Sequence, residues 1–429
     1  MVDDWIELPF SEAVLLNPPT PLKKGAIYPF VDMAAVMAGA RDVTCSEQRE
    51  FNGSGSRFQD RDTLMARITP CLENGKLARF RAPIDQRVGH GSTEFIVVRG
   101  KPEVTDNDFA YYLTISPEIR SFAISQMTGS SGRQRVPTDS LGGISVLIPS
   151  LEEQRKIVTV LSDLDDKIAV NERMNTTLEA MARALFQSWF VDFDPVRAKL
   201  DGSKPAGIDE PTANLFPDTF QDSELGNIPK GWTIKPVGEV VGCVGGGTPS
   251  TAELKYWEGG THHWTTPKDF SSLQSPILLN TDRKLTDAGI AKISSGLLPA
   301  GTLLLSSRAP VGYLAIASMP VAINQGFIAL KCNEYASNYF MLNWCQSNMP
   351  EIESRATGTT FAEISKQNFR PIRVVLPSKN LMSAFTAKVE PLYEKITANL
   401  RQSQTLASLR DTLLPKLLSG ELSVENLQP

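Results

Sequence analysis

The sequence holds few of the side chains that bind metals or perform acid–base catalysis. Its 429 residues include three histidines, two of them adjacent, and no His-Glu-x-x-His spacing or cysteine–histidine cluster. The glycines form neither a complete phosphate-binding loop nor a Gly-x-Gly-x-x-Gly frame, and no Pro-Asp with Glu-x-Lys nuclease motif is evident. We therefore expect no metal site and no catalytic centre in this chain.

Long hydrophobic runs and secretion signals are also missing. No run of 18 apolar residues occurs, and the first five residues lack the basic and apolar regions of a signal peptide. The five cysteines are odd in number and form no Cys-x-x-Cys pair, which favours incidental thiols in a reducing compartment. These features predict a cytoplasmic protein.

The net charge of −5 says little about binding partners, because the charge is unevenly distributed. The stretch 192–227 carries three basic and eight acidic residues and accounts for the whole excess. Residues 57–101 instead hold nine basic side chains against five acidic ones, which predicts a local positive face on an acidic protein. Nucleic acid is therefore not excluded as a partner.

The first half of the chain recurs in the second half. The segment that begins at Trp5 returns at Trp232, an offset of 227 residues, and Asp166–Asn171 returns as Glu394–Asn399 at an offset of 228. Solenoid repeats are about 50 residues or shorter, so each copy here is a domain with an appendage. The chain is therefore a pseudo-dimer on one polypeptide.

Each copy divides into a globular part and a helical part. Short strand-like runs, such as Phe95–Val98 and Ile372–Leu376, lie between turns rich in Gly, Pro, Ser and Asn. This pattern is typical of an α+β domain, and both domains end at a proline before a helical pattern begins. The expected domains are 1–150 and 228–378, and the expected helices are 151–191 and 379–420. An acidic Pro-rich connector, 192–227, joins the two copies, and a tail, 421–429, ends the chain.

Both helical segments carry a heptad seam, which predicts coiled-coil packing. The alternative is two amphipathic helices, each packed on its own domain. The first seam consists of Ile157, Leu161, Leu164, Ile168, Asn171, Asn175, Leu178, Ala182, Leu185 and Trp189. The second consists of Phe385, Val389, Leu392, Ile396, Asn399, Ser403, Leu406, Arg410, Leu413 and Leu417.

A polar layer interrupts both seams at the same central place and favours the coiled coil. If the helices pair antiparallel about their midpoints, Asn175 meets Asn399 and Asn171 meets Ser403, and buried amides of this kind fix register. The expected fold is thus α+β, with two globular domains held apart by an antiparallel pair of helices in a pseudo-twofold repeat. A seam of this length spans about 50 Å and would act as a ruler.

One pair of motifs suggests an adenine methyltransferase. Asn17-Pro18-Pro19-Thr20 resembles the catalytic Asn-Pro-Pro-aromatic motif, and Phe51–Gly55 resembles the Phe-x-Gly-x-Gly cofactor loop. Thr20 stands where the stacking aromatic is needed, and no buried strand precedes Phe51. The two pieces are also too close for a doubly wound sheet, so turn residues are the favoured interpretation.

The chain resembles the DNA specificity subunits of type I restriction-modification systems along essentially its whole length. Arg67–Lys76 with the Gly129–Val136 loop looks like one class of target recognition domain. Gly247–Ser250, Tyr256-Trp257 and Trp264–Asp269 look like another. The helix that begins near Glu153 and ends in Leu185–Pro195 looks like the family's central conserved region.

The resemblance implies a non-catalytic subunit that selects a bipartite DNA sequence. Residues 1–150 and 228–378 would be the target recognition domains, and 151–191 and 379–420 the conserved helices. The implied partners are double-stranded DNA, two modification subunits and restriction subunits, and S-adenosylmethionine, ATP and magnesium would be used by those subunits. A self-contained adenine methyltransferase and a coiled-coil scaffold without DNA recognition are the alternatives.

Candidate DNA contacts follow from chemical suitability in the turns of each domain. Arginine reads guanine and glutamine reads adenine through paired hydrogen bonds, whereas single lysines favour phosphates. The candidates in the first domain are Arg67, Asn74, Lys76, Arg133, Gln134 and Arg135. Those in the second are Thr266, Lys268, Arg308, Asn324, Gln325, Thr359, Thr360 and Lys366.

Overall fold

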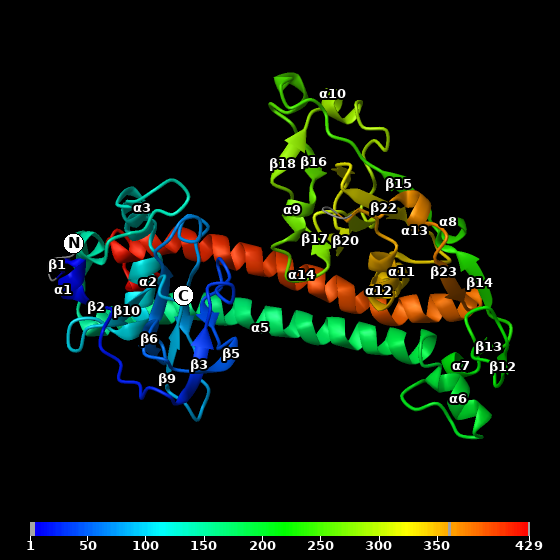
Figure 1. Ribbon diagram of the computed structural model, residues 1–429, viewed down its shortest axis with the longest axis horizontal. Coiled ribbons are helices and arrows are strands. Elements are labelled where there is room, and N and C mark those ends of the chain that lie inside the picture. The colour runs from blue at the N-terminus through cyan, green and yellow to red at the C-terminus, as the bar shows by residue number, and fades with distance from the viewer. Residues whose placement is uncertain (1–4, 359–361, 428–429) are drawn as a thin grey trace. The chain divides into compact units, whose positions relative to one another are not determined.

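The computed structural model describes residues 5–358 and 362–427, which divide into two compact units. Unit 1 contains the residues up to Ala169 and those from Gln404 onward, and unit 2 contains Val170–Ser403. Each unit therefore combines one globular region with one stretch of each long helix, α5 (Leu151–Phe190) and α14 (Lys379–Leu418) (Figure 1).

The globular region of unit 1 is built mainly from short strands. In chain order its elements are β1 (Ile6–Pro9), α1 (Phe10–Ala13), β2 (Val14–Leu16), β3 (Ile27–Val31), β4 (Asp42–Val43), β5 (Glu47–Glu50), β6 (Ser56–Gln59), β7 (Thr63–Ala66), β8 (Leu77–Phe80), β9 (Val88–Gly91), β10 (Phe95–Gly100), α2 (Asn107–Ile115), α3 (Pro117–Ser125), α4 (Thr138–Gly142) and β11 (Ser145–Ile148).

The core of unit 1 lies on both faces of a five-stranded sheet of order β2-β10-β7-β8-β4. Successive side chains of a strand point to opposite faces. On β7, Leu64 therefore packs with Phe58 of the second sheet, β5-β3-β9-β6, while Met65 packs with Phe109 of α2. Because both faces are covered, β7 is buried throughout and β10 is buried over its first four residues, without the alternation of a half-exposed strand.

The elements of unit 2 follow a similar order. They are α6 (Asp194–Leu200), α7 (Glu210–Ala213), β12 (Phe220–Gln221), β13 (Ile228–Pro229), β14 (Thr233–Pro236), α8 (Val237–Val240), β15 (Gly242–Gly245), η1 (Leu254–Tyr256), β16 (His262–Thr265), α9 (Pro267–Phe270), β17 (Ile277–Leu278), β18 (Arg283–Leu285), α10 (Asp287–Ile290), β19 (Leu303–Ser307), β20 (Val311–Ala317), β21 (Val321–Ile323), β22 (Phe327–Lys331), α11 (Asn338–Ser347), α12 (Met349–Ser354), α13 (Lys366–Phe369) and β23 (Arg373–Leu376). After α14, η2 (Val424–Leu427) closes the described chain.

The duplication in the sequence extends to strand pairing. Unit 2 has a five-stranded sheet of order β15-β22-β19-β20-β17 beside a three-stranded sheet, β18-β16-β21. In each unit the first and last strands of the globular region pair antiparallel, with Ile6 opposite Ile148 and Thr233 opposite Leu376. The paired positions are 227 and 228 residues apart, as in the sequence repeat.

Both long helices begin after the same Pro-Ser dipeptide. The Ser150 hydroxyl accepts a hydrogen bond from the Glu153 backbone N–H at 3.3 Å, and the Ser378 hydroxyl accepts one from Leu381 at 3.4 Å. A serine oxygen at this position satisfies an N–H group of the first turn, which has no partner within the helix. The helices therefore begin at Leu151 and Lys379.

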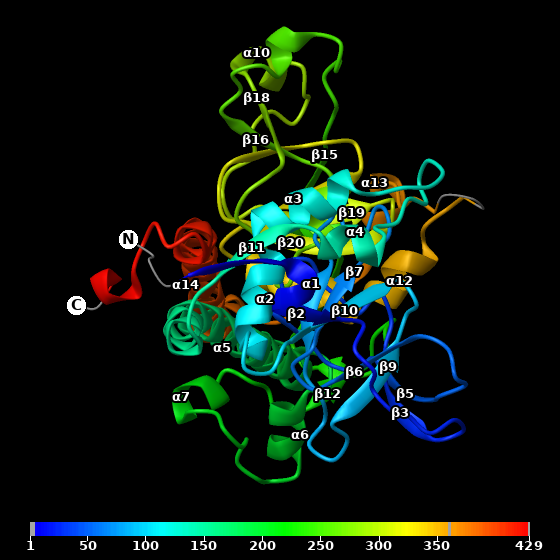
Figure 2. The ribbon, with the colours of Figure 1, turned by 90° about the vertical axis from the view of Figure 1, so that its left-hand side faces the viewer.

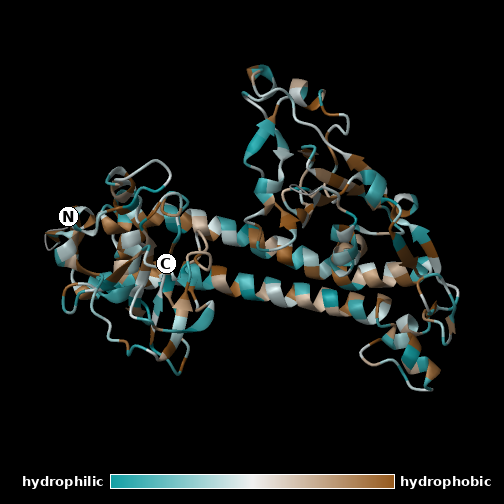
Figure 3. Ribbon diagram, viewed as in Figure 1, coloured by the Kyte–Doolittle hydropathy of each residue, from teal (hydrophilic) through white to brown (hydrophobic). Residues whose placement is uncertain are grey.

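Within unit 2 the two helices run antiparallel, as predicted from the heptads. The Asn399 side-chain amide donates to the Asn175 oxygen at 2.9 Å, and the Asn171 amide donates to the Ser403 hydroxyl at 3.2 Å and to Gln402 at 3.0 Å. No position of the predicted seams is exposed in either unit, and hydrophobic and hydrophilic residues alternate along both helices (Figure 3).

Within unit 1 the helices also run antiparallel, and Figure 2 shows them side by side nearly end-on. Leu161 of α5 clusters with Leu414 of α14. The charged seam position Arg410 pairs with Asp165 at 2.7 Å, and the Tyr112 hydroxyl of α2 donates to the same carboxylate at 2.7 Å. Burial, followed by the charge of Asp165, raises the pKa of Tyr112. Arg410 can therefore occupy a position of the second seam because the buried carboxylate of Asp165 faces it.

The acidic segment 192–227 is attached to unit 2. Val196 and Phe216 are buried in the same core cluster as Trp232. Asp209 forms an ion pair with Lys388 of α14 at 2.9 Å, and Glu224 forms one with Arg373 at 3.2 Å. The segment between the repeats thus contributes apolar packing as well as charge to unit 2.

Candidate nucleic-acid interface

A hairpin loop, Thr128–Val136, stands on unit 1 beside the end of β7, and we call it loop A. The backbones of Thr128 and Arg135 bond to each other at 3.0 and 2.8 Å and close the loop. Val136 donates its N–H to the Arg67 carbonyl at 2.9 Å, which fixes the loop to the sheet. Gly129 and Gly132 have φ of 127° and 77°, a region that favours glycine, so the tight turn needs them.

The three predicted contacts on loop A have different surroundings. Arg133 is exposed, and within the described part of the chain its guanidinium has no hydrogen-bonding partner. Gln134 is anchored by its backbone, which exchanges hydrogen bonds with Thr69 at 2.9 and 3.0 Å. Arg135 is held by both carboxylate oxygens of Glu94, at 2.9 and 2.6 Å. The side chains of Arg133 and Gln134 are therefore the free ones.

The second group predicted in unit 1 is only partly available. Lys76 donates its ammonium to the Met33 carbonyl at 2.8 Å, so this cation is already engaged. Asn74 is exposed in the turn after β7, where its backbone N–H donates to the Pro70 carbonyl at 2.9 Å. Arg67 donates to the Val136 carbonyl at 2.8 Å and faces an open pocket.

Unit 2 has a loop at the corresponding place, Thr357–Ile364, which we call loop B. Thr357 and Glu363 exchange backbone hydrogen bonds at 2.9 Å, and Ile364 donates to the Ser307 carbonyl at 2.9 Å, as Val136 does to Arg67 in unit 1. The Glu363 carboxylate forms an ion pair with Arg308 at 3.4 Å. The predicted contacts Thr359 and Thr360 lie outside the described residues.

Four predicted residues of unit 2 that are distant in sequence meet in one pocket. Thr266 and Lys268 at the start of α9, Arg308 after β19 and Asn324 before β22 line an open hollow of about 420 Å³. Gln325 lies beside this group, and its amide oxygen accepts a hydrogen bond from the Thr248 hydroxyl at 2.6 Å. Lys366 lies apart from it, exposed in the first turn of α13. The arrangement groups donors from three segments beside loop B.

The positive face expected over residues 57–101 is smaller than the charge count suggested, because five of the nine basic side chains are ion-paired. These are Arg61 and Arg79 with Asp108, Arg81 with Asp42, Arg87 with Asp60 and Arg99 with Asp62. Arg57 is exposed and was not among the predicted contacts, since a sequence count does not separate paired cations from free ones.

The Glu94 carboxylate joins the two arginine-bearing segments of unit 1 electrostatically. Hydrogen bonding from Arg135 lowers the pKa of Glu94, and the charge of Arg67 lowers it further. Glu94 is therefore ionised at neutral pH and holds Arg135 in place. Its single negative charge faces two positive ones, which leaves the region around loop A net positive.

The residues of the methyltransferase-like motifs have structural partners. The Asn17 amide oxygen accepts the Val97 N–H at 2.9 Å and its backbone N–H donates to the Val97 carbonyl, so this side chain ties β2 to β10. The Thr20 hydroxyl accepts from Arg99 at 2.8 Å, and Phe51 packs edge-on against His90. In the described part of the chain no His, Cys, Asp and Glu group is arranged to hold a metal, and no helix there is long and apolar enough to cross a membrane.

Comparison with known proteins gives consistent matches. Residues 82–180 and 229–402, more than half of the chain, match the family described as type I restriction modification DNA specificity domain. The type I restriction enzyme HindI specificity subunit of Haemophilus influenzae is 28% identical over 403 residues, which cover 84% of this chain and 86% of that protein. The MjaIX specificity subunit of Methanocaldococcus jannaschii is 26% identical over 330 residues, covering 75% and 70%.

A solved structure shares the fold. The type I restriction-modification S subunit from M. genitalium aligns with a TM-score of 0.53 at 16% identity, over 97% of this chain and 96% of that one.

Proposed function

The chain belongs to the type I restriction-modification DNA specificity family, and we propose that its two units each read one half of an asymmetric DNA target. The observation that carries this proposal is a duplicated scaffold with unlike loops. Loop A presents the free side chains of Arg133 and Gln134, which suit guanine and adenine edges, whereas loop B carries Glu363 bonded to Arg308. Two units of similar fold that carry different loops would select different half-sites.

We further propose that the chain directs chemistry performed by other subunits. Adenine methylation and ATP-dependent cleavage would belong to modification and restriction subunits, which would use S-adenosylmethionine, ATP and magnesium. The complex would act in the cytoplasm. The exposed Val170, Met174 and Met181, spaced four and seven residues apart on α5, offer an apolar stripe to such a partner, and the repeat favours two modification subunits per chain.

The proposal is tested with the purified chain, alone and mixed with its modification subunit. We expect the chain alone to neither methylate nor cut DNA, and the mixture to methylate adenine and to show two modification subunits per chain by native mass spectrometry. Methylation by the chain alone would instead identify a self-contained methyltransferase. An absence of salt-dependent DNA binding in the mixture would identify a scaffold without DNA recognition.

A further inference from the structure

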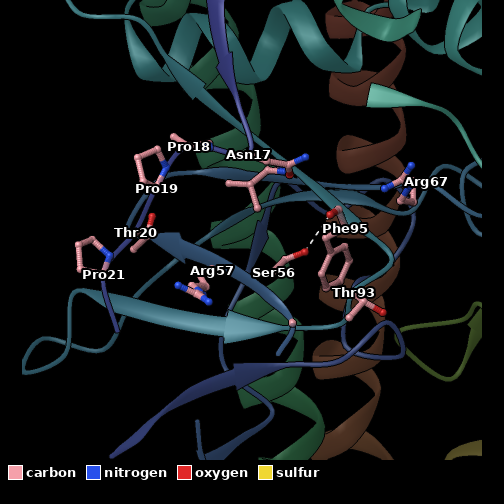
Figure 4. Close-up of a pocket in the computed structure, with 12 residues that line it drawn as sticks. Asn17, Pro18, Pro19, Thr20, Pro21, Ser56, Arg57, Arg67, Thr93 and Phe95 are labelled. Carbon is pink, nitrogen blue, oxygen red and sulfur yellow. Dashed lines mark hydrogen bonds between the residues drawn. The ribbon is translucent and has the colours of Figure 1, made fainter. Parts of the chain in front are cut away.

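We propose that an open pocket in unit 1 binds a backbone phosphate of the DNA through Arg57 and Arg67, which deepens the function proposed above and rests on it. The pocket has a volume of about 610 Å³ and lies between the Asn17–Pro21 segment and the start of β6. Figure 4 shows Pro18–Pro21 on one side, Arg67 and Thr93 on the other, and Arg57 and Ser56 below. The site thus joins two arginines that are ten residues apart in the sequence.

The two arginines keep most of their hydrogen-bonding capacity unused. Arg57 donates to the Gly53 carbonyl at 3.4 Å and Arg67 to the Val136 carbonyl at 2.8 Å, and among the described residues neither forms an ion pair. Arg61 and Arg99, by contrast, are each bonded twice to an aspartate. A guanidinium has five N–H donors, so Arg57 and Arg67 retain donors for an acceptor-rich ligand.

The pocket lining suits an anion. Of the described residues that line it, two are arginines and none carries a carboxylate. Glu94 follows the lining residue Thr93, but its carboxylate binds Arg135 instead. The three prolines contribute no backbone N–H. Two polar lining side chains are already bonded, because the Thr20 hydroxyl accepts from Arg99 at 2.8 Å and the Ser56 hydroxyl donates to the Phe95 carbonyl at 2.8 Å. The two arginines are the cations of this lining.

A phosphodiester fits this site better than a base edge does. Every base pair presents both donors and acceptors in the major groove, whereas phosphate oxygens only accept. Arg67 also fixes the site relative to loop A, because its side chain and its carbonyl both bond to Val136. A phosphate held here would set the position of the strand from which Arg133 reads bases, since phosphate contacts establish register.

The test measures DNA binding by the complex with the modification subunits across a salt series, for the cognate duplex and for duplexes with one base pair changed. Arg57→Ala should weaken binding to all duplexes alike and reduce the slope of log K against log salt concentration by about 0.9, the value for one phosphate contact. Arg57→Lys should keep most of the slope. Arg87→Ala is the matched control, because Arg87 is exposed just before the neighbouring strand β9 but paired with Asp60, and should leave the slope unchanged.

Three outcomes separate the possibilities. An unchanged salt slope in Arg57→Ala would overturn the phosphate site, and so would a loss confined to one base position, which would make Arg57 a base-reading residue. If thermal unfolding shows that Arg57→Ala is misfolded, Arg57→Gln, which keeps the Cβ–Cδ stem and a polar end but removes the charge, provides the same comparison. If the wild-type complex binds all duplexes equally, the proposed function fails, whatever the slope of the variant.

Discussion

Arg135 donates to both carboxylate oxygens of Glu94, from Nε at 2.9 Å and from a terminal nitrogen at 2.6 Å, while the guanidinium of Arg133, two residues earlier, has no partner among the described residues. The two arginines of loop A were predicted as equivalent contacts, and the ion pair separates them. Arg135 shapes the loop through Glu94, and Arg133 is placed to reach DNA. In unit 2 the corresponding loop is held by a pair of the opposite polarity, Glu363 with Arg308.

Single substitutions in loop A should therefore have distinguishable effects. Arg133→Ala should relax the preference at one base position of one half-site, at a cost of about 1–3 kcal/mol for a lost two-bond guanine contact. Arg135→Ala and Glu94→Gln should both disturb the whole half-site, because each breaks the same ion pair. Binding to a panel of duplexes with each base pair replaced in turn measures the difference. A Glu94→Gln profile that matches Arg133→Ala would contradict these roles.

The buried amide pair between the helices makes a prediction about stability. Asn175 and Asn399 are 2% and 1% exposed, so Asn175→Ala leaves the Asn399 amide buried without its acceptor, at about 1–3 kcal/mol. Replacing both by leucine should cost much less, because no buried polar group is then left unpaired. Denaturant unfolding of both variants tests this, with Met174→Ala on the same helical turn as an exposed control. Equal stability of Asn175→Ala and wild type would argue against the polar layer.

His90 should make the stability of unit 1 depend on pH. Its ring is buried between Phe30 and Phe51 and contacts the Arg49 carbonyl at 3.2 Å, and burial lowers the pKa of His90. Because the unfolded chain then binds the proton more readily, this contribution to stability is complete above about pH 6.5 and is lost as the pH falls toward the folded-state pKa.

The thermal unfolding midpoint of unit 1 should accordingly decrease as the pH is lowered from 7.5 to 5.5. His90→Gln should reduce that fall, because glutamine does not titrate. An NMR titration gives the direct check on the sign. A folded-state pKa of His90 at or above 6.5 would contradict the expected dependence.

The idea that the helices set the distance between half-sites stays a prediction. Four residues inserted after Asn171 and four after Asn399 lengthen both helices by about 6 Å and keep the seams roughly in phase. With about 3.4 Å per base pair, the preferred spacer should grow by one or two base pairs while the half-site bases stay the same. Methylation of duplexes with varied spacers measures this. Insertion after Asn171 alone is the control, because it shifts Asn175 away from Asn399. An unchanged optimal spacer length in an active double-insertion variant would refute the idea that the helices set the distance between half-sites.

The features that could be predicted from the sequence are those with a local period or an internal copy. Heptad spacing located α5 and α14, and the symmetry of the repeat then gave individual partners across the polar layer. The Trp5 and Trp232 offset likewise predicted two similar domains, and the pairing of β1 with β11 recurs as the pairing of β14 with β23. These predictions were possible because the residues on the packing face of a helix recur at every third or fourth position of the sequence.

The features that could not be predicted depend on contacts between segments with no common period. The parallel pairing of β3 with β9 joins residues 60 positions apart, Phe30 with His90, and leaves no repeating signal. The same is true of charge. Lys76 donates to the Met33 carbonyl at 2.8 Å, whereas Arg57 makes only a long hydrogen bond, to the Gly53 carbonyl at 3.4 Å, and no ion pair with any described residue. Only the folded chain distinguishes the two cations.

The most direct test of the central claim is to map methylated adenines in the genome of cells that carry this chain with its partner subunits. We predict one bipartite motif with two unlike half-sites around a fixed gap, which disappears when the chain is deleted. In cells carrying Arg133→Ala, one half of that motif should be relaxed and the other kept. Methylation that persists without the chain, or a continuous motif without a gap, would contradict recognition of DNA by two separate units.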